Sequence, residues 1–312
     1  MTSAKRDFLE IDELSHAELE TMLDTMVEWK ADPSKIRPAL AGRGVALVFE
    51  KPSARTRNSG EMAVVGLGGH PVTIRQDEIS IDQRESAEDV AKTLAAFHAI
   101  VAARVFDHTV LERMAAAVDV PIVNLLSDRA HPCQALADLL TIRELLGGLE
   151  GRRVAYVGDG NNVAASLAFG AALTGLELIV STPVGYELDD LVVDRARNLG
   201  GVVELVSDPH EAVKGVDVIY TDTWTSMGAE VEAEVRREAF AGWQVDDALM
   251  ATAGPSAHFL HCLPAHRGEE VAASVIDGPT SAVWQQAANR MHAKRALFAF
   301  LIEGTSLMEE HG

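Results

Sequence analysis

The sequence is poor in two features, and each shortage excludes a class of protein. Only two cysteines, Cys133 and Cys262, occur in 312 residues. They are too few for a disulfide framework, so each is either a packing residue or a chemical one. The most apolar stretch, Val163 to Leu176, is shorter than the roughly 18 residues that a membrane span needs. The first residues also lack the apolar core of a secretory signal. We therefore expect a cytoplasmic protein with no membrane partner.

Basic residues are scarce as well. The chain has 27 Lys and Arg against 47 Asp and Glu, which gives a formal net charge of -20. A surface this acidic repels the backbone of nucleic acids, so we expect no nucleic-acid partner. An anionic substrate would need a local cluster of arginines or backbone amides that overrides the overall field.

Short apolar runs alternate with amphipathic segments along nearly the whole chain, without repeats or long linkers. This alternation predicts an α/β fold with two doubly wound parallel-sheet domains joined by connector helices. The length agrees, at about 150 residues a domain. We expect residues 1–140 to form the first domain, with a C-terminal helix, 286–312, packing back on it. Residues 141–285 then form the second domain.

The individual elements follow from the same patterns. Ser15 and Glu18 have the spacing of a capping box at the start of the first helix. Further helices are predicted over residues 56–67, 86–98, 109–118, 131–146 and 281–303. Strands are predicted over residues 44–50, 70–75, 99–105, 120–126, 153–157, 176–181, 202–206, 216–221 and 258–263.

Ligands of open α/β sheets bind beyond the carboxyl ends of the strands, so the residues after each apolar run are the most informative. After the first run, the hydroxyls of Ser53 and Thr56 and the guanidinium of Arg55 lie at a helix start. Together with helix N-terminal amides they form an anion site of the phosphate type. The alternative is a Ser-capped helix with surface arginines; the fork of Arg55, suited to bidentate oxyanion binding, favours the anion site.

Two more polar residues follow apolar runs in the first half. Arg104 ends a mostly apolar strand, where a charge without a partner is costly, although an arginine at an exposed edge gives the same pattern. His131 stands at the start of the connector helix, before Pro132. The helix N-terminus should keep its imidazole neutral and able to hydrogen-bond a carbonyl. A capping histidine before an N1 proline is the alternative.

In the second half, residues 158–163 are similar to the dinucleotide fingerprint Gly-x-Gly-x-x-Gly. Val163 replaces the third glycine and no acid follows the next strand, so a nicotinamide dehydrogenase is the weaker interpretation. His261 and Cys262 are close to His266, as in some zinc sites. Because His261 and Cys262 are adjacent in a predicted strand, their side chains should point to opposite faces, and we expect no metal.

Four motifs in order resemble the aspartate/ornithine carbamoyltransferase family: Ser53-Ala-Arg-Thr-Arg57, His131-Pro-Cys-Gln134, Asp222-Thr-Trp-Thr-Ser-Met-Gly228 and His261-Cys-Leu-Pro264. The last two resemble its ornithine branch, and the resemblance extends to Asn289-Arg-Met-His292. It implies transfer of the carbamoyl group of carbamoyl phosphate to the δ-amine of L-ornithine, giving L-citrulline and phosphate. It also implies a homotrimer and no metal or organic cofactor. The biosynthetic or degradative direction does not follow from these residues.

The resemblance further implies roles for individual residues. Catalytic roles fall on Arg55, His131 and Cys262. Carbamoyl phosphate is expected to bind Ser53, Ala54, Arg55, Thr56, Arg104, His131, Gln134, Cys262, Leu263 and Arg290. Ornithine is expected to bind Asn162, Asp222, Ser226 and Met227.

One departure and two alternatives remain. Where the family usually carries a glutamine in a loop that binds carbamoyl phosphate, this chain has Ser80, and either Gln83 replaces it or the loop binds differently. The acceptor could also be putrescine, N-acetylornithine or aspartate, since an acceptor change can rest on a few loop residues. A non-catalytic carbamoyl phosphate-binding protein is the other alternative; the joint presence of the phosphate motif, His131 and Cys262 argues against it.

Overall fold

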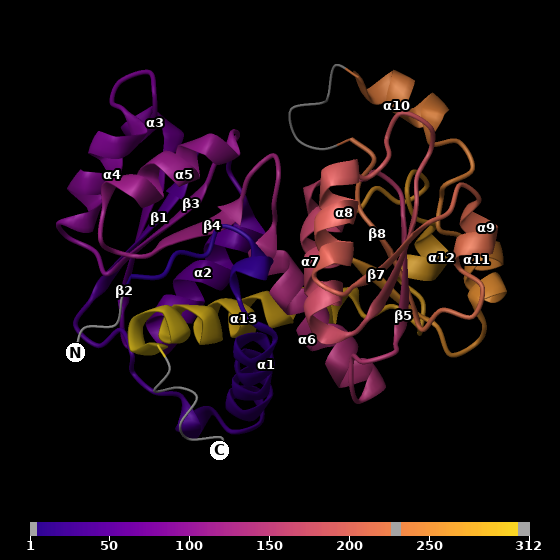
Figure 1. Cartoon of the computed structure of the whole chain (residues 1–312), viewed down its shortest axis with the longest axis horizontal. Coiled ribbons are helices and arrows are strands. Elements are labelled where there is room, and N and C mark those ends of the chain that lie inside the picture. Colours follow the sequence, from indigo (N-terminus) through magenta and orange to yellow (C-terminus); the bar gives the residue numbers. More distant parts are fainter. Residues whose placement is uncertain (1–4, 226–231, 305–312) are drawn as a thin grey trace. The chain divides into compact units, whose positions relative to one another are not determined.

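The computed structural model describes residues 5–225 and 232–304. The chain forms two compact units, residues 1–140 with 288–312 and residues 141–287. Each unit contains one parallel sheet with helices (Figure 1). Helices α6 (Pro132–Leu146) and α13 (Val283–Glu303) run from one unit into the other. The predicted α/β fold with two doubly wound parallel sheets and connector helices is confirmed.

The first unit is built on a four-stranded sheet in the order β2-β1-β3-β4. The chain moves outward from β1 to β2 and then returns to the other side of β1 with β3, so the topological switch point lies between β1 and β3. Both strands are buried almost throughout, as expected when helices cover both faces of a parallel sheet. The elements are η1 (Ile11–Glu13), α1 (His16–Ala31), η2 (Pro33–Lys35), β1 (Gly44–Phe49), α2 (Ala54–Gly66), β2 (His70–Arg75), α3 (Gln76–Ile79), α4 (Ala87–Ala95), β3 (Ile100–Arg104), α5 (His108–Ala117) and β4 (Ile122–Leu126).

The second unit has a five-stranded sheet in the order β7-β6-β5-β8-β9, and all its neighbours pair in parallel. Here the switch point lies between β5 and β8. The elements are β5 (Arg153–Val157), α7 (Asn162–Thr174), β6 (Glu177–Ser181), α8 (Asp190–Asn198), β7 (Val202–Leu205), α9 (Pro209–Ala212), β8 (Val218–Thr221), α10 (Ala233–Ala239), α11 (Asp247–Ala253), β9 (His258–His261) and α12 (Ala273–Ile276).

The predicted elements are present with shifts of a few residues at their ends. The capping box at α1 is confirmed: Ser15 Oγ accepts from the Glu18 N–H at 3.3 Å, and Glu18 Oε2 accepts from the Ser15 N–H at 2.8 Å. The strand predicted to reach residue 263 ends at His261, because Leu263 takes a left-handed φ of 60°. In the described part of the chain, no helix is long and apolar enough to cross a membrane.

Candidate active site

The N-terminus of α2 follows β1 at the switch point of the first unit. Ser53 caps this helix: its Oγ accepts from the Thr56 N–H at 3.3 Å and donates to Thr56 Oγ1 at 3.0 Å. Arg57 is paired with Glu61 at 2.8 Å. Arg55 is exposed, and within the described residues its guanidinium has no ion-pair partner. Of the two arginines of this motif, Arg55 is therefore the one available to an anion at the helix terminus.

Helix α13 is hydrogen-bonded to α2 at two places. Arg290 donates to Thr56 Oγ1 at 2.8 Å, and one turn further on Lys294 Nζ donates to Ser59 Oγ at 2.9 Å. Ser59 Oγ in turn donates to the Arg55 carbonyl at 2.6 Å. Residues more than 200 positions apart in sequence are thus joined at the first turns of α2.

Arg104, Arg290 and Lys294 form a buried cationic cluster around the imidazole of His131 in this unit; their exposed fractions are 6%, 3% and 0%, and that of His131 is 5%. Burial, together with Arg290 and Arg104 and against the opposing effect of Cys133, lowers the pKa of Lys294 to about 7. Burial also holds the pKa of His131 well below its usual range, assisted by Arg290, Arg104 and Lys294. The predicted neutral imidazole is confirmed, but the main cause is burial rather than the helix terminus.

Gln134 and Cys133 lie in the first turn of α6 and differ in whether their side chains can hydrogen-bond to a ligand. Gln134 Nε2 donates to Asp138 Oδ1 at 2.8 Å, while its Oε1 is buried and has no hydrogen-bond partner among the described residues. Burial raises the pKa of the Cys133 thiol to about 11, and its Sγ donates to the Asn124 carbonyl at 3.4 Å. Cys133 is therefore a packing residue, whereas Gln134 offers an acceptor that a ligand N–H would satisfy.

The loop after α3 contains the two alternatives for the missing glutamine. Ser80 ends α3 in a left-handed conformation with φ 46°, and its Oγ donates to the Gln76 carbonyl at 3.1 Å. The side chain of Gln83 is exposed. Arg113 fixes the loop through bidentate contacts of 2.7 and 2.9 Å to Asp82. The hydroxyl of Ser80 is thus held by the loop itself, while the amide of Gln83 faces solvent.

Asp222 follows β8 at the switch point of the second unit and is buried. Its Oδ2 accepts from Asn161 Nδ2 at 2.9 Å, and its Oδ1 accepts from the Thr223 N–H at 2.7 Å. Asn161 caps α7, since its Oδ1 accepts from the Val163 and Ala164 N–H groups. The residue that caps α7 therefore also orients the carboxylate of Asp222. Asn162, the first residue of α7, directly follows this cap in sequence.

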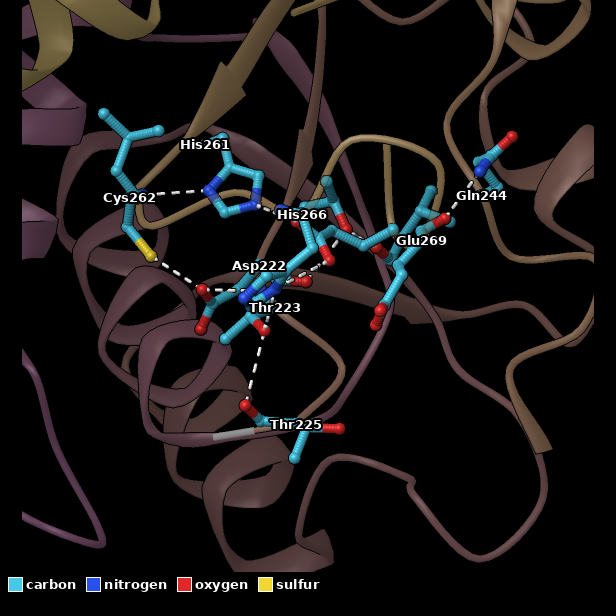
Figure 2. A network of polar contacts seen from close by, with 12 residues as sticks. Asp222, Thr223, Thr225, Gln244, His261, Cys262, His266 and Glu269 are labelled. Carbon is cyan, nitrogen blue, oxygen red and sulfur yellow. Dashed lines mark hydrogen bonds and ion pairs between the residues drawn. The ribbon is translucent and has the colours of Figure 1, made fainter. Parts of the chain in front are cut away.

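Cys262 faces the same carboxylate, as Figure 2 shows, and its Sγ donates to Asp222 Oδ1 at 2.9 Å. Ligand atoms of Asp222, His261 and Cys262 lie within 4.8 Å of one another. The prediction that His261 and Cys262 point to opposite faces is wrong, because β9 ends at His261 and strand alternation does not extend to Cys262.

Both ring nitrogens of His261 nevertheless contact residues of the loop that follows β9. Its Nδ1 accepts from the Leu263 N–H at 2.9 Å, so the proton of the neutral ring is on Nε2, which faces Glu270 Oε1 at 3.2 Å. Both ring nitrogens are occupied, which leaves the ring no lone pair for a metal ion. Glu270 is fully buried and also accepts from the backbone N–H of His266, so one carboxylate holds both histidines.

Trp224, two residues after Asp222, is held through its backbone by an arginine of α10. Arg236 on α10 pairs with Asp159 at 2.8 Å and donates to the Trp224 carbonyl at 2.9 Å. Burial raises the pKa of Asp159 in spite of this arginine. The predicted ornithine ligands Ser226 and Met227 lie outside the described residues.

Gly160, in the glycine motif that resembled a dinucleotide fingerprint, has a packing role. A Cβ at this position would meet the Leu188 backbone nitrogen at 2.3 Å and the Glu187 carbonyl carbon at 2.5 Å. Only glycine permits this approach of two backbone segments. Packing therefore accounts for the glycine without a bound pyrophosphate.

Both units match models of one family. The carbamoyl-P binding domain of aspartate/ornithine carbamoyltransferase matches residues 6–144, and the Asp/Orn binding domain matches residues 150–301. The chain belongs to the aspartate/ornithine carbamoyltransferase family. This confirms the resemblance drawn from the four sequence motifs.

Relatives within the family match over nearly the full chain. Ornithine carbamoyltransferase from Acidothermus cellulolyticus is 50% identical over 302 residues, which are 96% of this chain and 97% of the relative. The protein from Pyrococcus furiosus named "Ornithine carbamoyltransferase, anabolic" is 45% identical over 307 residues, 96% of this chain and 98% of the relative. The solved ornithine carbamoyltransferase structure from Pyrococcus furiosus has a TM-score of 0.92 at 44% identity, covering 97% of this chain and 99% of that one.

Two residues that contact the predicted site residues were missed from the sequence. One is Asn161, which orients Asp222 through the hydrogen bond from its Nδ2. Lys294 had a sequence signal: it lies four positions after Arg290, hence on the same helix face, and precedes the apolar stretch 296–301.

Proposed function

We propose that this protein transfers the carbamoyl group of carbamoyl phosphate to the δ-amine of L-ornithine, giving L-citrulline and phosphate. The observation that carries the proposal is the 50% identity to an ornithine carbamoyltransferase over 96% of this chain. In this reaction the amine nitrogen forms a bond to the carbamoyl carbon. The bond from that carbon to the phosphate oxygen breaks, the phosphate leaves with the bonding electrons, and the proton that the amine gives up passes to the phosphate or to solvent.

Carbamoyl phosphate is assigned to the first domain, residues 1–140 with the C-terminal helix 286–312. Ser53, Ala54, Arg55 and Thr56 would hold the phosphate with the amides of the α2 terminus and the guanidinium of Arg55. Arg290, which donates to Thr56 Oγ1, would add a second guanidinium. The buried cations around this helix terminus support an anion site in a chain with a net charge of -20.

The carbamoyl group would lie against Arg104, His131 and Gln134. Arg104 supplies positive charge as the oxygen becomes negative in the tetrahedral transition state. A neutral His131, favoured by the lowered pKa of its ring, suits a hydrogen bond to the carbonyl oxygen. The free Oε1 of Gln134 would accept from the carbamoyl NH2 group.

Ornithine is assigned to the second domain, residues 141–285. Asp222 would bind the δ-amine, with Asn162, Ser226 and Met227 as further ligands. The Cys262 thiol donates to Asp222, and on ornithine binding it would exchange this contact for one to the amine. The backbone of Cys262 and Leu263 would face the carbamoyl amide. Positioning and charge stabilisation suffice for this reaction, so we propose no metal or organic cofactor.

An acceptor screen tests this assignment. Purified protein is given saturating carbamoyl phosphate with ornithine, putrescine, N-acetylornithine or aspartate, and each carbamoylated product and the released phosphate are measured. We expect turnover with ornithine at least about 100-fold above the others, a difference of about 2.7 kcal/mol in transition-state binding. Comparable use of putrescine or N-acetylornithine would refute the acceptor, and absence of turnover with all four would favour a non-catalytic binding protein.

We also propose a cytoplasmic homotrimer that works in the biosynthetic direction. The relative from Pyrococcus furiosus named as anabolic supports the direction. Light scattering coupled to size-exclusion chromatography tests the assembly, with an expected mass of three times 33.5 kDa. A monomer or dimer at micromolar concentration would refute the trimer.

A further inference from the structure

Lys294 is a buried lysine in an unusual place. It lies on α13 with no exposed surface, and its Nζ donates to Ser59 Oγ at 2.9 Å and to the Arg290 carbonyl at 3.4 Å. Among the described residues, no carboxylate lies within ion-pair distance of its Nζ. Lysine is rarely buried without an ionic partner, because transfer of the ammonium ion from water is costly. Some other feature must make a lysine acceptable here.

The position of Lys294 connects it to the proposed phosphate site. Ser59, its hydrogen-bond partner, donates to the Arg55 carbonyl, and Arg290, one turn earlier on α13, donates to Thr56. Both contacts reach the first turns of α2, whose N-terminus carries the anion-binding motif. Lys294 and Arg290 therefore hold α13 against the turn that would bind the phosphate.

We propose that Lys294 is a positioning residue for carbamoyl phosphate: it fixes α13 on the first turns of α2, and its buried charge adds to the binding of the dianion. This inference rests on the proposed function, since it takes carbamoyl phosphate as the anion. Lys294 acts on the phosphate through Ser59 and Arg290 and through its charge, not by direct contact.

The charged groups around Lys294 explain how an anion would act on it. It faces Arg290 on α13, Arg104 on β3, and His131 and Cys133 at the start of α6. Burial, Arg290 and Arg104 hold the pKa of Lys294 at about 7 against the opposing effect of Cys133, so its ammonium form is lost as pH rises through this value. A bound dianion favours the ammonium form, so binding should take up a proton above pH 7.

The other titratable groups of the cluster do not change charge over the same range in the free protein. The pKa of His131 is held well below its usual range, and that of the Cys133 thiol is about 11. A change in anion affinity between pH 6.5 and 8.5 therefore reports on Lys294. Sulfate is a suitable probe, because its own charge is constant over these pH values.

The experiment compares the wild type with Lys294→Met, which keeps the length and removes the charge, and Lys294→Arg, which keeps the charge. Lys30→Met is the matched control: Lys30 also contacts α13, through Asn289 Oδ1 at 2.7 Å, but on a residue outside the cluster. Calorimetry gives the sulfate Kd, and steady-state kinetics gives KM for carbamoyl phosphate, KM for ornithine and kcat, all from pH 6.5 to 8.5. Thermal melting shows that each variant is folded.

We expect the wild-type affinity for sulfate to fall about tenfold over this range, in step with the loss of the ammonium form. In Lys294→Met, the Kd should be flat with pH, and KM for carbamoyl phosphate should rise about tenfold at pH 6.5 while KM for ornithine changes less than twofold. Lys294→Arg should keep tight binding with no pH dependence. Lys30→Met should behave as the wild type.

Two results would overturn the inference. One is an unchanged pH dependence of sulfate binding in folded Lys294→Met, and the other is an equal loss in Lys30→Met. Failure of the proposed function is distinguishable from both. If the wild type binds sulfate with the expected pH dependence but does not carbamoylate ornithine, the role of Lys294 in anion binding is supported and the proposed reaction is refuted.

Discussion

Replacing Asp222 by asparagine should destabilise the second unit as well as impair the reaction. Asp222 Oδ2 accepts from Asn161 Nδ2, and Oδ1 accepts from the Thr223 N–H and the Cys262 thiol. An asparagine has one acceptor oxygen in place of two. Whichever way the new amide turns, its NH2 group faces an existing donor.

Asn161 cannot relieve this conflict by rotating its own amide. Its Oδ1 accepts from the N–H groups of Val163 and Ala164 at 2.9 and 3.3 Å, and from the Tyr156 hydroxyl at 3.2 Å. Rotation would break all three hydrogen bonds. Asp222→Asn therefore leaves a buried donor unsatisfied, which costs about 1 to 3 kcal/mol. For a domain of about 150 residues, a loss of about 2 kcal/mol lowers Tm by about 4 to 8 °C.

The kinetic effect should follow from the loss of charge. An amide cannot form an ion pair with the δ-ammonium group of ornithine, so we expect KM for ornithine to rise about tenfold or more, equal to about 1.4 kcal/mol. KM for carbamoyl phosphate should change little. Calorimetric melting measures the stability, and citrulline formation measures the kinetics.

The double variant Asn161→Asp, Asp222→Asn separates the two effects. It exchanges donor and acceptor, so the carboxylate at position 161 can accept from both the helix amides and the new amide at position 222. We expect Tm to return to within about 2 °C of the wild type, because all the hydrogen bonds are restored. KM for ornithine should stay raised, because the negative charge has moved. An unchanged Tm in Asp222→Asn, or no recovery in the double variant, would refute this reasoning.

Three further predictions concern the first unit and the acceptor. Arg55→Ala should keep the wild-type Tm and raise KM for carbamoyl phosphate by at least about 30-fold in steady-state assays, which equals a loss of about 2 kcal/mol in binding free energy. Unchanged kinetics would remove Arg55 from the site. Arg113 lowers the pKa of Glu88 to about 2. The contribution of the Glu88–Arg113 pair to the free energy of unfolding is therefore present above pH 4.5 and is lost as pH falls toward 2. The difference in free energy of unfolding between wild type and Arg113→Met, measured with urea, should therefore become smaller from pH 5 to pH 3. A constant difference would contradict the pairing. Activity at fixed, subsaturating ornithine should climb from pH 7 to 9, because the δ-amine, with a pKa near ~10.4, must be neutral to attack; a flat profile would contradict this.

Most of the fold follows from the sequence because buried parallel strands give continuous apolar runs that turn residues interrupt. Val45, Leu47 and Val48 are all fully buried in β1, as their run predicts. The anion motif predicted at residues 53–56 and Asp222 were singled out for the related reason that the residues following such strands lie at the carboxyl edge of the sheet. Local pattern and one rule of sheet topology are sufficient for these features.

The features that the sequence did not reveal depend on contacts between distant segments. Lys294 meets Ser59 across 235 positions, and no local pattern specifies which face of α2 receives α13. His131 was assigned the correct charge for an incomplete reason, because its degree of burial and its arginine neighbours arise only in the folded domain. Cys262 was placed on the wrong face because the strand ends two residues earlier than its apolar pattern.

The net charge and the cationic cluster act at different ranges. Surface acids account for the charge of -20, and at physiological ionic strength their field is screened beyond about 8 Å. Arg104, Arg290 and Lys294 are buried, where the effective dielectric constant is lower and screening by salt is weak. With these cations inside the first unit, the chain can remain strongly acidic at its surface and still bind the dianion that we propose at the terminus of α2. In that proposal the surface charge would bear mainly on how fast the anion arrives, and the buried cluster on how tightly it is held.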